Sequence, residues 1–351
     1  MTNNFNQIGR AGTVAATIVL FFLLNFPALV QAAPEDSALA PAIVTLQPGV
    51  TGEQIQQALD GLPAAGGQVI LPAGKISISQ PIVLDHDFET LRGSGAGTVL
   101  WLTNDANCPV IIMGEPVNNP KRTIGNLCVR DLFIDGNRSQ QQRELWKVKG
   151  EGSDIRNNGI TVQNVTNSTV EHVTCTRCRS GGLVTTRKVR QLTVYELDSS
   201  DNQFDGLACY QTEHCLFTEL NLHNNPGAGI SLDLSFSQNV ISNAVLTADD
   251  LGIFMRSSCS NQFYNVSMRD CRHHGVFMAQ ELEETPSGWD EVPRTECTRN
   301  SFTNLIAIDC GGPAFRVNDT TCTNNIIVQA NFKGNPKGGL SQVEPDLVLV
   351  R

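Results

Sequence analysis

The chain has 351 residues, a formal net charge of −10 and a calculated pI near 5.1. This length is large for a single compact core but ordinary for an elongated domain built from repeats. The acidic balance argues against nucleic acid as a partner, because proteins that bind nucleic acids present surfaces rich in lysine and arginine.

Residues 1–32 are predicted to be a signal peptide. Arg10 precedes the apolar run 11–24, and the small residues Val30 and Ala32 occupy the −3 and −1 positions of a cleavage site. The run is shorter than the roughly 20 residues that a membrane-spanning helix needs. We therefore expect a secreted or periplasmic protein, with an uncleaved N-terminal anchor as the alternative. The eleven cysteines agree with an oxidising compartment, although an odd number cannot all pair within one chain.

A capping helix is predicted over residues 51–62. Thr51 and Gln54 have the spacing of a capping box, and Ile55 and Leu59 fall on one apolar face. A repeat domain needs such a cap, because its terminal strands would otherwise pair with strands of other chains.

Two sequence patterns then recur in phase. A glycine followed by an aliphatic residue returns at steps of 23 or 24 residues, and an insertion of roughly 16 residues delays the next member, Ala314-Phe315. The second pattern, Asn-x-apolar-x-Asn, occupies residues 239–243, 261–265 and 300–304. The glycine pairs are Gly159-Ile160, Gly182-Leu183, Gly206-Leu207, Gly229-Ile230, Gly252-Ile253 and Gly275-Val276.

The segments between these markers alternate apolar and polar residues, which predicts short strands, about three in each repeat. A constant step of about 23 residues predicts a parallel β-helix of about 10 coils, in which each strand pairs with the next coil ~4.8 Å away. A β-sandwich fits poorly, because its strands do not keep a constant register. We predict an all-β domain over residues 44–335, helix included, with 33–43 as a linker and 336–351 as a C-terminal tail or cap.

Three stretches resemble a known superfamily. The sequence IQQALDGLPAAGGQVILPAGKISISQPIVL, then LRGSGAGTVL, then LFIDGNR, followed by the glycine-aliphatic coils, is similar to pectate-lyase-like right-handed parallel β-helices. The resemblance covers residues 44–331. It implies the right-handed fold and a superfamily that includes pectate and alginate lyases, polygalacturonases, mannuronan epimerases, phage depolymerases and members without known chemistry. The Asp-Pro-His-Asp motif of the epimerases is absent. Of the polygalacturonase motifs, only two have weakly similar counterparts here, namely Asp249-Asp250 and His273–Gly275.

The repeat also predicts which side chains share one face. If the repeat glycine is position zero, positions +1 and +3 point inward, and +2 and +4 point outward. The +4 residues of three consecutive coils are Tyr210, Asp233 and Arg256, close enough to touch at a coil spacing of ~4.8 Å.

We predict that these three residues are catalytic. Arg256 would bind a sugar carboxylate, Tyr210 would move a proton, and Asp233 would orient them or help to bind a cation. Calcium is the one candidate cofactor, and no metal site is assigned. The alternative is that Asp233 and Arg256 form a surface salt bridge, worth about 0–1 kcal/mol and without chemistry.

An aromatic step is predicted beside these residues. Phe254 and Phe277 occupy outward +2 positions on adjacent coils. A sugar ring can lie on such a surface, because its C–H faces are apolar.

Four more residues are predicted to contact substrate. Asp250, His273 and His274 lie in the turn before the strand and form either a subsite or an ordinary polar turn. Trp289 lies in the insertion 281–296, where it either stacks on carbohydrate or packs its own loop.

The sequence therefore predicts an exported carbohydrate-active protein. The favoured activity is that of a polysaccharide lyase or epimerase acting on a uronic-acid-containing polysaccharide. One alternative is a non-catalytic β-helix that binds glycan or a surface partner. Another is a polygalacturonase-like glycoside hydrolase, which needs a second carboxylate roughly 5–10 Å from Asp233. We expect a polysaccharide partner, no nucleic acid and no membrane contact beyond the export signal. Both a monomer and an oligomer are compatible with the sequence.

Overall fold

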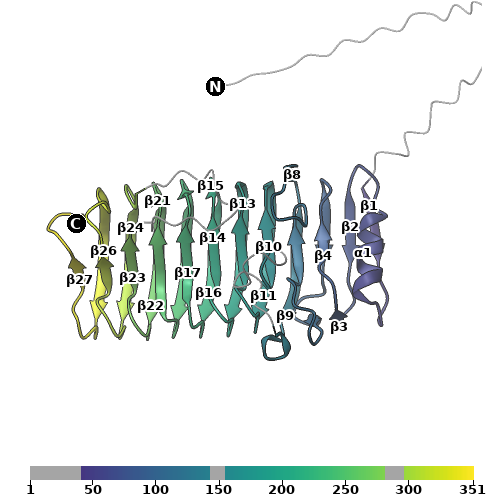
Figure 1. Ribbon diagram of the computed structural model, residues 1–351, viewed down its shortest axis with the longest axis horizontal. Coiled ribbons are helices and arrows are strands. Elements are labelled where there is room, and N and C mark those ends of the chain that lie inside the picture. The colour runs from purple at the N-terminus through teal and green to yellow at the C-terminus, as the bar shows by residue number, and fades with distance from the viewer. Residues whose placement is uncertain (1–40, 143–154, 281–295) are drawn as a thin grey trace, which may run out of the picture. The chain divides into compact units, whose positions relative to one another are not determined.

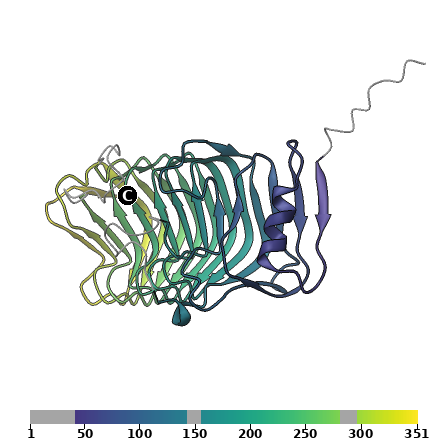
Figure 2. The same cartoon turned by 45° about the vertical axis from the view of Figure 1, so that its right-hand side comes forward.

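The computed structural model describes residues 41–142, 155–280 and 296–351. They wind into a right-handed parallel β-solenoid of about 12 turns, with strands of successive turns side by side (Figure 1, Figure 2). The predicted fold class is confirmed. The number of turns exceeds the expected value of about 10, because the first turns carry no repeat glycine. The predicted signal peptide lies outside the described residues.

The described strands form two parallel sheets. The ten-stranded sheet contains β4 (Ile82–Leu84), β7 (Ile111–Met113), β10 (Ile160–Gln163), β12 (Leu183–Thr186), β14 (Leu207–Tyr210), β17 (Ala228–Asp233), β20 (Leu251–Arg256), β23 (Val276–Ala279), β25 (Phe315–Val317) and β27 (Leu340–Gln342). This sheet carries the predicted site.

The second sheet has 18 described strands and wraps the remaining sides of each turn. They are β1 (Ala42–Thr45), β2 (Gly67–Ile70), β3 (Gly74–Ile78), β5 (Glu89–Arg92), β6 (Thr98–Leu102), β8 (Ile124–Gly125), β9 (Cys128–Asp135), β11 (Val165–Thr176), β13 (Val189–Ser200), β15 (Thr212–Glu213), β16 (Leu216–His223), β18 (Phe236–Ser237), β19 (Val240–Thr247), β21 (Ser258–Cys259), β22 (Gln262–Arg269), β24 (Ser301–Ile308), β26 (Asn325–Lys333) and β28 (Val348–Val350). A 3-10 helix spans Arg138–Gln140. One turn, such as β15–β16–β17, contains three short strands, as predicted.

The inward columns form the core. Positions +1 and +3 of every repeat are fully buried, as Ile230, Leu232, Ile253 and Met255 illustrate. The parallel register that stacks them places Ile230 opposite Ile253. Aliphatic side chains therefore lie one above another along the solenoid.

The repeat glycines are required by close packing between turns. A Cβ atom on Gly252 would lie 2.5 Å from the carbonyl oxygen of Gly275, and one on Gly275 would lie 2.5 Å from that of Ala314. Cβ atoms in proteins do not approach other heavy atoms so closely. At Gly252 and Gly275 the strand can therefore begin only with a residue that lacks a side chain.

The Asn-x-apolar-x-Asn pattern combines two structural roles. Its first asparagine is buried and bonds along the stack, as where Asn261 Nδ2 donates to Asn300 Oδ1 at 3.0 Å. Its last asparagine adopts a left-handed conformation at a bend, with φ values of 51° at Asn243 and 53° at Asn265. Asparagine tolerates this conformation better than most residues.

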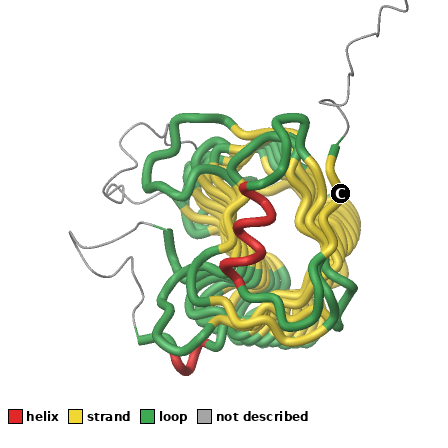
Figure 3. The backbone as a smooth tube through the Cα atoms, turned by 90° about the vertical axis from the view of Figure 1, so that its right-hand side faces the viewer, coloured by secondary structure: helices red, strands yellow, loops and turns green. Residues whose placement is uncertain are grey.

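Helix α1 (Gly52–Asp60) lies across the N-terminal end of the turns (Figure 3). The capping box is present, because Gln54 N donates to Thr51 Oγ1 at 3.3 Å and Thr51 N donates to Gln54 Oε1 at 3.0 Å. Gln56 ties the helix to the adjacent turn, with its side chain accepting from Val83 N at 2.8 Å. At the other end, β27 and β28 continue both sheets beyond residue 335.

Candidate functional site

The three residues predicted as catalytic form one column on the outer face of the ten-stranded sheet. The pairing of β14 with β17 places Tyr210 opposite Asp233. Arg256 lies at the end of the next strand, β20, and reaches back to the Asp233 carboxylate. The structure thus brings together residues that are more than 20 positions apart in the sequence.

Asp233 and Arg256 form an ion pair that is largely removed from solvent. Arg256 Nε donates to Asp233 Oδ2 at 3.1 Å, and Arg256 Nη2 bonds the same oxygen. Asp233 Oδ1 accepts from Leu234 N at 2.8 Å. The Asp233 side chain is 6% exposed and that of Arg256 is 24% exposed. The pair is more buried than an exposed surface salt bridge, and its part in catalysis stays a prediction. Both carboxylate oxygens are already engaged, so Asp233 is suited to hold Arg256 in place rather than to attack a substrate.

Tyr210 is suited to donate a proton. Burial raises the pKa of its hydroxyl above the usual value, the charge of Arg156 lowers that pKa, and the carboxylates of Asp205 and Asp233 raise it. The hydroxyl is therefore protonated at neutral pH.

Asp205 is a titratable group in this region that the sequence reasoning did not select. Its Oδ1 accepts a hydrogen bond from Ala228 N at 2.7 Å. Burial raises the pKa of Asp205 to about 6, the Ala228 hydrogen bond and the charge of Arg156 lower it, and the charge of Asp233 raises it. A carboxyl group with a pKa near neutrality can accept or donate a proton at working pH. Its sequence position, immediately before repeat glycine Gly206, was the one available signal.

A row of stacked rings leads away from Arg256. The guanidinium carbon of Arg256 lies 5.1 Å from the ring centroid of Phe254. The rings of Phe254 and Phe277 are 5.8 Å apart and nearly parallel, at 5°, and Phe277 stacks on His274 at 5.5 Å and 13°. Both phenylalanines are half-buried. The predicted aromatic step is therefore present, and it connects Arg256 with His274, which lies in the turn before β23.

The histidine turn also contains the expected contact between neighbouring coils. His273 Nδ1 lies 2.9 Å from Asp250 Oδ1, and His273 is mostly exposed. Burial lowers the pKa of His274, and the neighbouring His273 lowers it further. His274 is therefore a neutral ring at neutral pH, which suits stacking. Trp289 lies outside the described residues.

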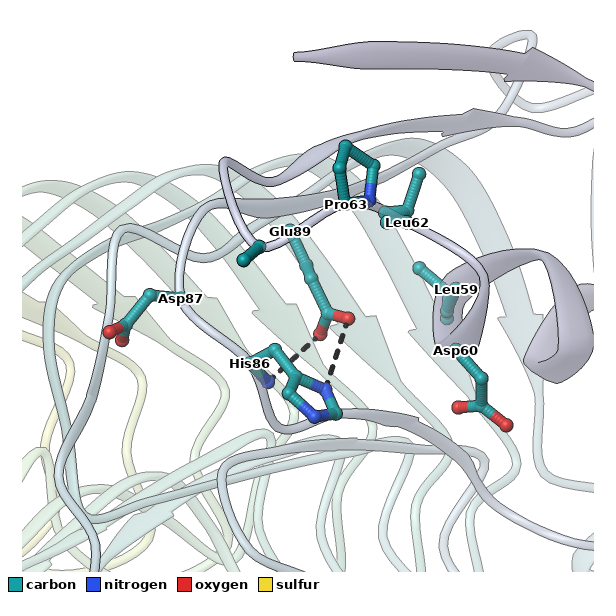
Figure 4. A pocket seen from close by; sticks show the side chains of 8 residues that line it. Leu59, Asp60, Leu62, Pro63, His86, Asp87 and Glu89 are labelled. Atoms are coloured by element: carbon teal, nitrogen blue, oxygen red, sulfur yellow. Dashed lines mark hydrogen bonds and ion pairs between the residues drawn. The ribbon is translucent and has the colours of Figure 1, made fainter. Parts of the chain in front are cut away.

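A separate pocket lies beside the capping helix (Figure 4). Burial raises the pKa of Glu89 there to about 7, and its carboxylate accepts from His86 N at 3.2 Å. None of the predicted site residues contributes to it. Its lining comprises Leu59, Asp60, Leu62, Pro63, Ala64, His86, Asp87 and Glu89.

Neither a cluster of metal-binding side chains nor a membrane-spanning helix occurs in the described ranges. Residues 41–142, 155–280 and 296–351 contain no group of three or more histidine, cysteine, aspartate or glutamate side chains that could hold a metal ion. No helix within these ranges is long and apolar enough to cross a membrane.

Residues 89–339 match the family model described as NosD, periplasmic copper-binding protein. No curated protein matches the chain. Similar solved structures include the A-module of mannuronan C-5 epimerase AlgE6 from Azotobacter vinelandii, with 17% identity, a TM-score of 0.64, and coverage of 82% of this chain and 75% of that one.

Two further solved structures of carbohydrate-active enzymes share the fold. Alginate lyase from Paenibacillus sp. str. FPU-7 is 10% identical, with a TM-score of 0.62 and coverage of 88% of this chain and 99% of that one. Polygalacturonase from Erwinia carotovora ssp. carotovora is 14% identical, with a TM-score of 0.58 and coverage of 89% and 96%. Identities this low show a common fold, and neighbours with this fold perform epimerisation, elimination and hydrolysis.

Proposed function

This chain belongs to the NosD family, and from that premise we propose that it is an exported enzyme that acts on a uronic-acid-containing polysaccharide, as a lyase or an epimerase. The observation that carries the proposal is the Arg256 guanidinium, which a buried carboxylate holds beside a row of aromatic rings. A cation next to an apolar platform matches a sugar ring that bears a carboxylate.

The proposed chemistry begins with removal of the proton on the carbon next to the sugar carboxylate. Arg256 binds that carboxylate and stabilises the negative charge that develops on it as the proton leaves. Asp205 accepts the proton, because its pKa of about 6 leaves it mostly ionised at neutral pH. Tyr210 then donates its proton, either to the leaving oxygen in an elimination or to the opposite face of the same carbon in an epimerisation.

Each remaining predicted residue has a supporting role in this proposal. Asp233 orients Arg256, and Phe254, Phe277 and His274 form the surface on which neighbouring sugar units lie. Asp250 and His273, joined at 2.9 Å, contribute hydrogen bonds to a more distant unit. Trp289 stays a predicted contact.

Neither copper nor calcium has a role in the proposed reaction. The described residues contain no cluster of three or more histidine, cysteine, aspartate or glutamate side chains that could hold a metal ion, so no step of the proposed reaction is assigned to the copper of the family description. Both oxygens of Asp233 are engaged by Arg256 and Leu234, which disfavours a calcium ion there. We expect chelation with EDTA to leave turnover unchanged.

Hydrolysis is the second candidate, and one observation favours it. Asp205 provides a second carboxylate within electrostatic range of Asp233, and glycoside hydrolysis commonly uses two carboxyl groups. The engagement of both Asp233 oxygens weighs against it, because neither oxygen is free to attack or to activate water.

Binding of short oligosaccharides tests the proposal. We expect oligouronates to bind more tightly than neutral oligosaccharides of equal length, and Arg256→Gln to remove that preference. Arg299→Gln is the matched control, because Arg299 contacts Ser260 in the bend between β21 and β22, strands of the other sheet. Equal binding of charged and neutral ligands, or an unchanged preference in Arg256→Gln, would contradict the proposal.

Export is proposed from the N-terminal sequence together with the periplasmic description of the family. We propose cleavage after Ala32, so that the mature chain begins at Ala33. N-terminal sequencing of the exported protein would show Ala33 first; a chain that still begins at its original N-terminus would contradict cleavage.

A further inference from the structure

One pair of cysteines lies on neighbouring turns near the C-terminal end of the solenoid. Strands β22 and β24 pair with Arg269 opposite Ile308, and continuing that register by two residues places Cys271 opposite Cys310. The backbone keeps this alignment, because Gly311 N donates to Cys271 O at 2.9 Å. The two thiols lie close enough to interact, and both cysteines are buried.

A second pair repeats the arrangement one turn further on. Strands β24 and β26 are in register at their starts, where Asn300 Nδ2 donates to Asn325 Oδ1 at 3.0 Å. Three residues earlier, the same register places Cys297 opposite Cys322. Their thiols also lie close enough to interact, and both side chains are fully buried.

The spacing of these positions suits a disulfide bond. Neighbouring parallel strands lie ~4.8 Å apart, within the range of roughly 4.4–6.8 Å that disulfides span between Cα atoms. Cys209, by contrast, lies opposite Thr185 on one side and Leu232 on the other.

We propose that Cys271–Cys310 and Cys297–Cys322 become disulfide bonds when the chain folds in an oxidising compartment. This inference rests on the export proposed above but not on any enzymatic activity. For each bond, one cysteine thiolate attacks the disulfide of a thiol–disulfide oxidoreductase and forms a mixed disulfide. The partner thiolate then displaces the oxidoreductase, which leaves with both of its thiols reduced, having taken two electrons; the two cysteines lose their two protons to solvent.

The bonds would fasten the end of the solenoid that is opposite the capping helix. In the described part of the chain, β27 pairs only with β25 and β28 only with β26, so the last turn has one neighbour. The two bonds join three consecutive turns and interlace, because Cys297 lies between Cys271 and Cys310 in the sequence. Such closed loops reduce the freedom of the unfolded chain.

Thiol counting on the full-length exported protein tests the inference. The protein is denatured in an alkylating reagent without reductant, and its mass is compared with that of a reduced and alkylated sample. Eleven cysteines less the four in the two bonds should leave seven thiols alkylated before reduction and eleven after it. Peptide mapping should identify the linked pairs Cys271–Cys310 and Cys297–Cys322. Eleven alkylated thiols without reduction, or other linked pairs, would overturn the inference.

A variant without the four cysteines provides an independent readout. Reductant should lower the Tm of the wild-type protein by roughly 5–10 °C and leave the Tm of the variant Cys271→Ser/Cys297→Ser/Cys310→Ser/Cys322→Ser unchanged. Cys108→Ser, which changes a half-buried cysteine outside both pairs, should respond to reductant like the wild type. An equal response in all three proteins would also overturn the inference. Uronate turnover is measured separately, so a failure of the proposed enzymatic function would leave these results unaffected.

Discussion

Arg256 reaches across one turn of the solenoid to bind the buried carboxylate of Asp233, with Nε 3.1 Å from Oδ2. The same guanidinium lies 5.1 Å from the ring centroid of Phe254. Burying a charge is costly unless a partner compensates it. The pair therefore holds a cation at a fixed place beside an aromatic surface, which is the feature that a uronate-binding groove requires.

Replacing Arg256 should impair both function and stability. Arg256→Gln leaves Asp233 without its charged partner, so we expect unfolding free energy to fall by about 3 kcal/mol and uronate turnover to disappear. Arg256→Lys retains the charge but cannot place two N–H donors on the Asp233 carboxylate as Arg256 does. We expect kcat/KM of this variant to fall on the order of 10- to 100-fold. Steady-state kinetics and urea unfolding measure both effects. Arg299→Gln should change stability by less than about 0.5 kcal/mol; full activity in Arg256→Gln would contradict the assigned role.

The aromatic row should contribute to substrate binding more than to the chemical step. Phe254→Leu and Phe277→Leu each remove one stacking surface, worth about 1 kcal/mol. We therefore expect KM for an oligouronate to rise roughly 5-fold with little change in kcat. Tyr264→Leu, on the other sheet, is the control and should leave KM unchanged. A loss of kcat at constant KM would assign the rings a different role.

Asp205 should set the acidic limb of the pH profile. Its pKa of about 6 means that a base at this position gains activity as pH rises through 6. If Asp205 instead served as the acid of a hydrolase, activity would fall as pH rises through 6. Measuring the kinetics of the wild type and of Asp205→Asn between pH 4 and 9 distinguishes a base from an acid at this position. We expect the variant to lose most of its turnover and the rise in activity around pH 6.

Asp249 should make the fold less stable at alkaline pH. It is fully buried in a column otherwise occupied by Asn202 and Asn225, and its Oδ1 accepts from Asn225 Nδ2 at 2.9 Å. Its Oδ2 has no hydrogen-bond partner among the described residues. Burial raises the pKa of Asp249 to about 7, and Asp205 raises it further, while hydrogen bonds from Asn225 and the charge of Arg272 lower it.

The sign of this dependence follows from linkage. The folded-state pKa of Asp249 exceeds the unfolded value of about 3.9, so the folded protein binds the proton more tightly. The stabilisation is complete below pH 4 and is lost as pH rises through 7. Asp249→Asn should therefore be more stable than the wild type by about 1–3 kcal/mol at pH 8, with a smaller difference at pH 5. Urea unfolding at both pH values measures this; an equal difference at both would contradict the assignment.

The repeat glycines should not tolerate a side chain. Gly252→Ala places a Cβ atom 2.5 Å from the Gly275 carbonyl oxygen, and we expect unfolding free energy to fall by more than about 2 kcal/mol. Gly97→Ala is the matched control, because its Cβ would lie 3.5 Å from the nearest atom, an ordinary contact. Thermal unfolding of both variants tests this prediction. Comparable stability of the two would show that close packing does not determine the repeat.

The fold was predictable because its determinants recur in the sequence. The spacing between Gly252 and Gly275 gives the number of residues in one turn. The alternation of apolar and polar residues after each glycine shows which side chains point inward. Counting from the repeat glycine also predicts that Tyr210, Asp233 and Arg256 share one column. Residues at equivalent positions of parallel repeats lie side by side in neighbouring turns.

Properties that depend on distant segments were not predictable. Asp205 acquires its raised pKa from burial and from the charge of Asp233 on the next turn, while Arg156, a residue of the preceding insertion, lowers that pKa. The outward position of Gln163 is buried, because its side chain donates to the carbonyl oxygens of Glu115 and Val117. The repeat determines which face a side chain occupies, whereas loops from elsewhere in the chain determine whether that face is covered.

Deuterium exchange at the carbon next to the uronate carboxylate tests the central claim most directly, because elimination and epimerisation both begin by breaking that C–H bond. The wild-type protein is incubated with oligogalacturonate and oligoalginate in D2O, and the products are examined by NMR. We predict either deuterium at that carbon or an unsaturated uronate at the new chain end, with both absent in Asp205→Asn. New reducing ends with neither signal would contradict the account in favour of hydrolysis, and unchanged oligosaccharides would contradict catalysis on these substrates altogether.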